Sequence, residues 1–557
     1  MTHDEQSGHL TADADPRPLA FDWRQFGLPS RIVCLALVFS LELILLPVLA
    51  GIQRLAYQVS EWGPVIVRGA VGFAILIATF AWLKHRPALT RISAELSGAP
   101  IDFRLLTAHL FSITLFGVLS AVLYGSHFPH PQGPANILFA AVWLTTGIVS
   151  LAVAGIALIP PRLWMRMIRD TGSLWVWAIV TVLFACLAGK ASQSLWPLAT
   201  GITFHLSQAM LSPFVSQMVV DPVKMVIGTP RFTVGIAPVC SGLEGVGLIL
   251  SFGILWLTLF RKECRFPHAL LLLPAGVVII FVLNSARIAA LVLIGDAGAE
   301  QIAMRGFHSQ AGWLAFSLVS LGFSVAASKV QWLRVPERNI QPRVVSRFEN
   351  PTVRWVLPFV TILAAGMIAA AATGDFEWFY PLRFFAPAVT LFFLWRRYTN
   401  LCWRVSWFAP AIGVVVFLIW IGFDRFTSAL PEKMPVPLAA ASPLARSLWL
   451  TLRVLAATVT VPVAEELAFR GFLYRRLLSA DFESVSLRRF SWLALLISSA
   501  IFGLLHGDRW FVGTVAGSLY ALALIRRGSM GDAVVAHATT NALLAVDVLA
   551  FHHWHLW

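Results

Sequence analysis

Long apolar runs recur along almost the whole of this 557-residue sequence, and they restrict the chain to one class of fold. Hydrophobic residues make up 58% of the chain and charged residues only 13%, whereas soluble domains carry about 25% charged residues. Apolar runs of about twenty residues are typical of helices that cross a bilayer. The sequence therefore predicts an all-α polytopic membrane protein.

Apolar length predicts about fifteen transmembrane helices. The first eight lie near residues 32–51, 64–83, 105–125, 135–160, 173–191, 244–260, 268–294 and 311–329. The other seven lie near residues 352–373, 381–396, 407–423, 446–464, 490–506, 510–526 and 534–551. Residues 192–243 are too polar for an ordinary span, and we expect an extracytoplasmic or interfacial segment there.

Basic residues gather in every second loop of the first eight predicted helices. The clusters are Lys84/Arg86/Arg91, Arg162/Arg166/Arg169, Arg261/Lys262/Arg265 and the stretch KVQWLRVPERNIQPRVVSR. We expect the protein in the inner (plasma) membrane of the cell. The positive-inside rule then places these loops and the N-terminus in the cytoplasm. The same rule accounts for the net charge of +14, so no nucleic-acid partner is expected.

The basic, proline-containing stretch also marks the best internal boundary. We predict a cytoplasmic tail at 1–31, a transmembrane domain of about eight helices at 32–330, a basic cytoplasmic linker at 331–350 and a second domain of about seven helices at 351–557. Both domains are expected to be helical bundles. The five cysteines form no CxxC pair, so neither a zinc knuckle nor a disulfide framework is indicated.

Three reactive residues of the first domain are predicted to meet at the extracytoplasmic face of the membrane. Cys240 in APVCSGLEG precedes the predicted helix 244–260, which runs inward to the Arg261 cluster. Arg287 in NSARI lies in the outer part of the next helix, and His308 lies in the following outer loop. A thiolate nucleophile, an imidazole acid/base and a guanidinium for an oxyanion form a workable catalytic set. Taken singly, each residue also has an ordinary structural role.

A second polar set lies in the C-terminal half, in VPVAEELAFRGFLYRRLL, FGLLHG and AHATTNALL. Glu466 lies four residues before Arg470, so the two share a helix face and can pair. Glu465 points about 100° away from Glu466. His537 and Asn541 are also four residues apart, and His506 lies between these two stretches.

One glutamate acting as a general base, with His506, His537 and Asn541 holding water and oxyanion, would suffice for peptide hydrolysis. The alternative is a structural ion pair with two helix-end histidines. The sequence has no HExxH zinc motif, and we expect no cofactor. A divalent metal bound by Glu465, His506 and His537 is possible but not favoured. The predicted spans put His506 nearer the outer face than Glu465, which is at odds with one shared site.

APVCSG, NSARI and GFHSQAGW, in this order, resemble the signature regions of the exosortase and archaeosortase families over about residues 1–330. The resemblance implies a membrane transpeptidase with Cys240 as nucleophile, His308 as acid/base and Arg287 as the oxyanion or substrate-orienting residue. It also implies the substrates: exported, membrane-anchored proteins with a C-terminal sorting tail. The new carboxyl end would pass to an acceptor nucleophile that the sequence does not identify.

EELAFRG, FGLLH and HATTN resemble the EExxxR, FxxxH and HxxxN pattern of CPBP intramembrane proteases, which include the CAAX prenyl endopeptidases. The match covers about residues 440–551. It implies Glu465 as the base that activates water, supported by Glu466, Arg470, His506, His537 and Asn541. The fusion of both signatures resembles the exosortase E/protease type, which implies a VPEID-CTERM-like sorting signal. Two alternatives remain: a polytopic transporter, or an active exosortase with a non-catalytic C-terminal scaffold.

Overall fold

Apolar α-helices dominate the computed structural model, which describes residues 27–49, 85–97, 99–124, 134–180, 183, 193–237, 240–335, 350–427 and 433–557. Within these residues eight helices are long and apolar enough to cross a membrane, and three shorter helices are apolar. The all-α polytopic class is thereby confirmed. The predicted span 64–83 and about half of the predicted span 173–191 lie outside the described residues, and the total of fifteen stays a prediction.

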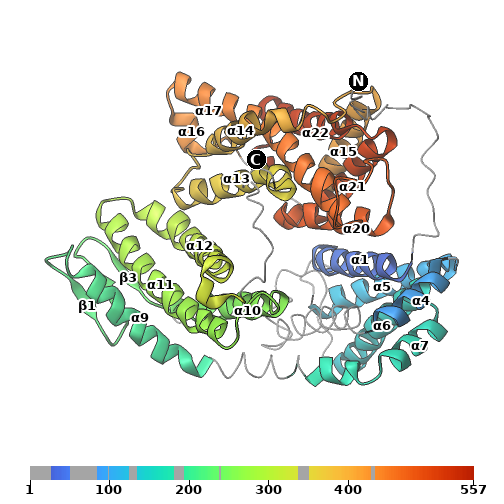
Figure 1. The fold of residues 1–557 in the computed structure, drawn as a ribbon, viewed down its shortest axis with the longest axis horizontal. Helices are drawn as coiled ribbons and strands as arrows, with labels where there is room; N and C mark the ends of the chain where they lie inside the picture. Colours follow the sequence, from blue (N-terminus) through green and yellow to red (C-terminus); the bar gives the residue numbers. More distant parts are fainter. Residues whose placement is uncertain are drawn as a thin grey trace, which may run out of the picture.

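The N-terminal helices form a group of their own (Figure 1, blue to teal). They are α1 (Leu28–Leu49), α4 (Arg86–Ser97), α5 (Phe103–Tyr124), α6 (Pro134–Leu158) and α7 (Pro161–Thr171). The apolar helices α5 and α6 pack against each other. The short helix α7 buries Leu163 and Met167 on one face and leaves Arg169 exposed on the other, as expected of an amphipathic helix at a surface.

The central helices carry the first site (Figure 1, green). They are α9 (Trp196–Leu211), α10 (Leu243–Leu259), α11 (Leu272–Asp296) and α12 (His308–Lys329). Between α9 and α10 lies a small antiparallel sheet in the order β1 (Val219–Asp221), β2 (Val226–Gly228) and β3 (Thr233–Gly235). The sheet is tied to the end of α11 by a hydrogen bond from Thr229 Oγ1 to Asp296 Oδ1.

Residues 192–243, which we expect to form an extracytoplasmic or interfacial segment, contain the helix α9. The helix packs along α11, with Phe204 buried and with hydroxyls donating to backbone carbonyls: Thr203 Oγ1 to Ser241 O (2.9 Å) and Ser207 Oγ to Ser285 O (3.2 Å). Polar side chains that bond across helices allow a polar helix to pack in this way. Among the described residues α9 is not one of the helices long and apolar enough to span, so the placement of 192–243 relative to the membrane stays a prediction.

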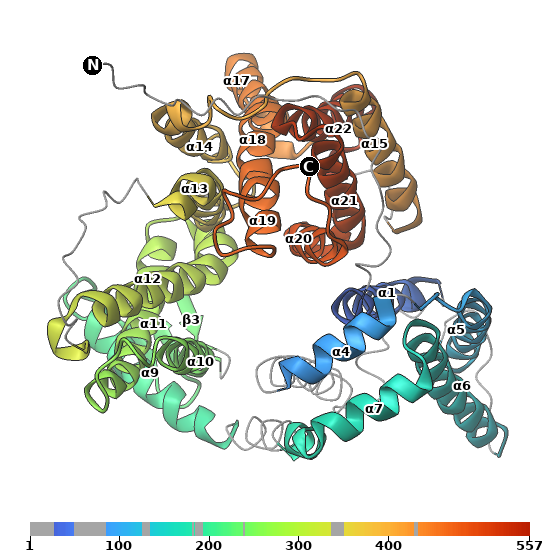
Figure 2. The same cartoon turned by 45° about the vertical axis from the view of Figure 1, so that its right-hand side comes forward.

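The C-terminal half is a second bundle (Figure 2, yellow to red). Its first helices are α13 (Pro351–Ala371), α14 (Leu382–Leu394) and α15 (Phe408–Thr427), followed by the short α16 (Val436–Ala440). A long helical stretch then runs through α17 (Pro443–Leu455), α18 (Val461–Glu466) and α19 (Tyr474–Arg476). The last helices are α20 (Trp492–Leu504), α21 (Trp510–Arg527) and α22 (Met530–Phe551).

Two π-helical segments, Ala456–Thr460 and Leu467–Leu473, flank α18 and widen this stretch. Pro462 lies inside the stretch and cannot donate a backbone hydrogen bond, which favours a local change of helix geometry. Such widened turns are frequent at functional sites, because they free carbonyl groups and turn side chains. The two glutamates of the predicted second site lie between the widened turns.

The two halves lie against each other along α13, which packs on α12 and on the turn before it (Figures 1 and 2). Helix α1 also packs on α20. Residues 336–349 of the predicted linker lie outside the described residues, so the domain boundaries at 31, 330 and 350 stay predictions.

Removal of the Phe204 ring tests whether α9 belongs to the bundle. Phe204→Ala leaves a cavity against α11, and we expect a loss of about 3 kcal/mol in unfolding free energy, seen as a lower thermal midpoint in detergent. Leu198 is 66% exposed on the same helix, so Leu198→Ala is the matched control and should change the midpoint little. Equal effects of the two variants would contradict the packing described here.

Candidate active sites

Cys240 is held in a tight turn just before α10. Gly242 adopts φ = 87°, a left-handed conformation that favours glycine, and caps the start of the helix. Asn284 on α11 donates from Nδ2 to the Cys240 carbonyl at 3.0 Å. A Cβ at position 242 would lie 3.0 Å from the same Asn284 nitrogen, so the turn and the amide fit closely. This packing fixes the backbone that carries the thiol.

The three predicted residues of the first site come together. Cys240 Sγ lies 3.9 Å from His308 Nε2, and Arg287 Nη1 donates to the His308 carbonyl at 3.1 Å. Arg287 therefore orients the residue that faces the thiol. Sequence reasoning missed Asn284, although it lies three residues before Arg287 and so shares a face of α11 with it.

A cavity of about 130 Å³ adjoins this set. Its polar lining residues are Glu244, Asn284 and Arg287, and Trp313 and Phe316 of α12 form part of its apolar wall. Arg287 Nε is buried without a hydrogen-bond partner among the described residues, so the guanidinium keeps a donor for a ligand. Neither Cys240 nor His308 lines the cavity, so Arg287 is the member of the predicted set that connects the two. A cationic side chain that lines a cavity suits a peptide carbonyl that becomes an oxyanion.

In the second half, Glu466, Arg470 and His537 form a buried cluster. Glu466 Oε1 forms an ion pair with Arg470 Nη1 at 3.1 Å and accepts a hydrogen bond from His537 Nδ1 at 3.0 Å, and Glu466 is fully buried. Arg470 also donates from Nη2 to Gly517 O at 2.8 Å and lies over the Phe502 ring. The predicted pairing of Glu466 with Arg470 is confirmed, and local spacing could not show the other three contacts.

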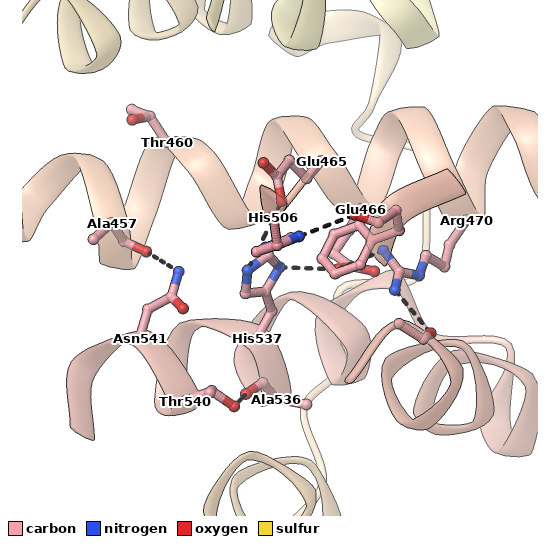
Figure 3. A network of polar contacts seen from close by, with 12 residues as sticks. Ala457, Thr460, Glu465, Glu466, Arg470, His506, Ala536, His537, Thr540 and Asn541 are labelled. Atoms are coloured by element: carbon pink, nitrogen blue, oxygen red, sulfur yellow. Dashed lines mark hydrogen bonds and ion pairs between the residues drawn. The ribbon is translucent and has the colours of Figure 1, made fainter. Parts of the chain in front are cut away.

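Glu465 is the glutamate without a strong partner. Its Oε2 lies 3.9 Å from His537 Nε2, which is an ion-pair distance and too long for a hydrogen bond. The same Oε2 is buried with no hydrogen-bond partner among the described residues. The Nδ1 of His537 donates to Glu466, so the Nε2 of the same imidazole faces Glu465. Figure 3 shows both carboxylates on the same helix, turned to different neighbours.

His506 completes this group from a third element. Its Nδ1 lies 2.9 Å from the Phe502 carbonyl, and because a carbonyl only accepts, Nδ1 donates and Nε2 keeps its lone pair. Figure 3 places the ring beside Glu465 and His537. Asn541 instead donates from Nδ2 to Ala457 O at 2.7 Å, a carbonyl of the first π-helical segment.

Helix α20, which precedes His506, is short for a membrane span. It has 13 residues, so it is about 20 Å long, shorter than a hydrocarbon layer of about 30 Å. Glu465 lies well inside the stretch Pro443–Arg476, which is long enough to span. Glu466, Arg470 and His537 are buried within the bundle, and the depth of the site in the membrane stays a prediction.

The aromatic packing around His537 was not predicted. Tyr520 of α21 stacks on the imidazole at 4.8 Å between ring centroids, and Phe502 approaches it edge-on at 5.7 Å. The FGLLH stretch contains Phe502, but nothing in the local pattern links Tyr520 to His537. Among the described residues no three His, Cys, Asp or Glu side chains are grouped as metal ligands. The expectation that the site works without a metal or other cofactor stays a prediction.

Comparison with known protein families gives two separate matches. Residues 67–325 match the transmembrane exosortase family, and residues 447–543 match the type II CAAX prenyl endopeptidase Rce1-like family. No curated protein and no solved structure matches the chain. The first match contains Cys240, Arg287 and His308, and the second contains all six residues of the other set. The predicted fusion is confirmed: this is a multi-pass membrane protein that joins an exosortase-family region to a CAAX-protease-family region.

Proposed function

We propose that the first half is a cysteine peptidase and transpeptidase that cleaves the C-terminal sorting tail of exported, membrane-anchored proteins. The contact between Cys240 Sγ and His308 Nε2 carries this proposal. The exosortase match supports processing of exported proteins with sorting signals. The VPEID-CTERM-like form of the signal rests on the resemblance of the fusion alone.

The proposed first reaction proceeds through a thioester. His308 Nε2 takes the Cys240 thiol proton, and the thiolate attacks the peptide carbonyl while Arg287 stabilises the oxyanion. The C–N bond breaks, and the imidazolium returns the proton to the leaving amine. His308 then deprotonates an acceptor nucleophile, which attacks the thioester and regenerates the thiol. Water as the acceptor would give hydrolysis instead of transfer.

We propose that the second half is an intramembrane endopeptidase of the CAAX type, with Glu465 as the general base. Glu465 takes a proton from water, and the hydroxide attacks a peptide carbonyl. Nε2 of His506 and His537 face this space, where they exchange protons with the water and the leaving amine. Glu466 and Arg470 hold His537 from behind. The second half would trim the tail that the first half releases, or process a partner.

The transporter alternative gains no support from this arrangement, because transporters pair broken helices at corresponding positions in two related halves. Here the two halves differ in motif and in match. The scaffold alternative, in which only the first half is active, is separated by the variants below.

Replacement of Cys240 tests the first site. Cys240→Ala should lower cleavage of a tagged exported protein with a sorting tail by about 10⁴-fold or more, because the covalent step loses its nucleophile. Cleavage is measured in cells by blot of the tagged protein. Cys402→Ala, at an exposed cysteine of the second half, is the matched control. Unaltered processing by Cys240→Ala would remove the first-site assignment.

Replacement of the two adjacent glutamates separates catalysis from stability. Glu465→Gln should abolish second-site cleavage, scored on the tail released from the same tagged protein, with little change in thermal midpoint. Glu466→Gln should destabilise the fold by about 3–5 kcal/mol, because Arg470 remains buried with its partner neutralised. If Glu465→Gln leaves every cleavage product unchanged, the scaffold alternative takes the place of the endopeptidase.

Thiol labelling tests the predicted orientation. In chains that keep one cysteine each, a membrane-impermeant maleimide added to intact cells should label Cys240 and spare Cys402. Cys402 is exposed and lies beside Arg396, Arg397 and Arg404, in a loop that the charge pattern places in the cytoplasm. It should react only after permeabilisation. The reverse pattern would overturn the proposed topology.

A further inference from the structure

The turn that carries His308 rests on the second half of the chain. It is a π-helical segment, Ile302–Phe307, that leads directly into α12. Gly306 of this segment faces the C-terminal end of α13. A Cβ at position 306 would fall inside van der Waals contact with the carbonyl oxygens of Ala370 and Thr373, and 2.9 Å from that of Ala371. Only glycine allows the two backbones to approach so closely.

Two neighbouring contacts extend the same junction. Arg305 Nη1 lies 3.5 Å from Asp375 Oδ1, just past the end of α13. A Cβ on Gly374 would lie 3.3 Å from Gln301 Cβ and from Ile302 Cγ1. A glycine therefore lies at the contact on each side of the junction: Gly306 on one side and Gly374 on the other. The charge pattern also puts the turn and this end of α13 on the outer face, independently of their contact.

The far part of α13 packs on the second site. Phe359 and Phe469 pack edge-to-face at 5.3 Å between centroids, and Gly471 lies directly against the Trp355 ring. Phe469 and Gly471 belong to the π-helical segment that follows Glu465 and Glu466. One helix, α13, thus contacts the His308 turn at one end and the glutamate-bearing stretch along its side.

We propose that the C-terminal end of α13 positions His308, so that the second half completes the active site of the first. The inference rests on the proposed function, because it assigns His308 as the base that serves Cys240. Gly306 is then a positioning residue: it touches no substrate, and it sets how deeply the His308 turn docks.

The geometry makes the first site sensitive to this docking. His308 lies two residues after Gly306, and its imidazole and carbonyl meet Cys240 and Arg287 respectively. Cys240 Sγ and His308 Nε2 are 3.9 Å apart, so a further separation of these atoms would prevent direct proton transfer. A misplacement of about 1 Å at a catalytic group costs about 10²-fold in rate. A side chain at position 306 would lift the turn off α13 and move His308 with it.

Alanine substitution at Gly306 in the full chain provides the test. Alanine is the better helix former, so a loss in Gly306→Ala reports the lost docking rather than helix propensity. We expect kcat for the tagged sorting-tail protein to fall about 10²-fold, with KM nearly unchanged. Gly322→Ala on α12, where a Cβ meets nothing within 4 Å, is the matched control and should retain wild-type kcat.

The rate of Cys240 alkylation is a readout that would not change if Gly306 had only a structural role. In a chain whose other cysteines are serine, iodoacetamide reacts with the thiolate, so its rate against pH reports how His308 serves the thiol. Gly306→Ala should shift this profile toward that of His308→Ala. Gly374→Val disturbs the same junction from the α13 side and should shift it likewise, which covers the case in which Gly306→Ala fails to fold.

The outcomes separate the inference from the proposed function. If His308→Ala changes the profile while Gly306→Ala and Gly374→Val behave as wild type, the docking inference is overturned and the cysteine–histidine site stands. If His308→Ala itself leaves the profile unchanged, the proposed first site fails, and the inference fails with it. A shift in all three variants, with Gly322→Ala unchanged, supports both.

Discussion

A polar group inside a bilayer has no water to bond with, so each one must find its partner within the chain. Several buried groups of the structure meet this requirement. Hydroxyls of α9 donate to carbonyls beside Cys240 and on α11, and Arg470 pairs with Glu466 and donates from Nη2 to the Gly517 carbonyl. The cost of leaving such groups unpaired explains why these polar side chains lie on helix faces that meet other elements.

Two of the buried polar atoms without a hydrogen-bond partner among the described residues lie where the proposed chemistry needs them. Arg287 Nε and Glu465 Oε2 each belong to a histidine-containing set. Their neighbours hold these sets in place: Asn284 donates to the Cys240 carbonyl, and Glu466 Oε1 accepts from His537 Nδ1. Glu466 Oε2 and Arg470 Nη1 also lack such a partner, so the second site keeps more than one unsatisfied polar atom.

Local sequence spacing anticipated much of this and failed where contacts are long-range. The four-residue step from Glu466 to Arg470 predicts their pair because both lie on one helix. Alternating loop charges brought Cys240 and His308 together because topology alone decides which loops share a face. No local pattern shows that α9 bonds to α11, that Tyr520 stacks on His537, or that α20 is shorter than the hydrocarbon layer of a membrane. These depend on packing between segments far apart in sequence.

The junction at Gly306 changes what the fusion means physically. Two domains joined only by a linker would raise each other's local concentration and do no more. Here the backbone of one half contacts the backbone of the other, two residues from His308, and α13 continues from that contact to the stretch that bears Glu465. Pro358 lies inside α13, between the contact at Trp355 and the contact at Ala370. The two candidate sites therefore share one helix as well as one chain.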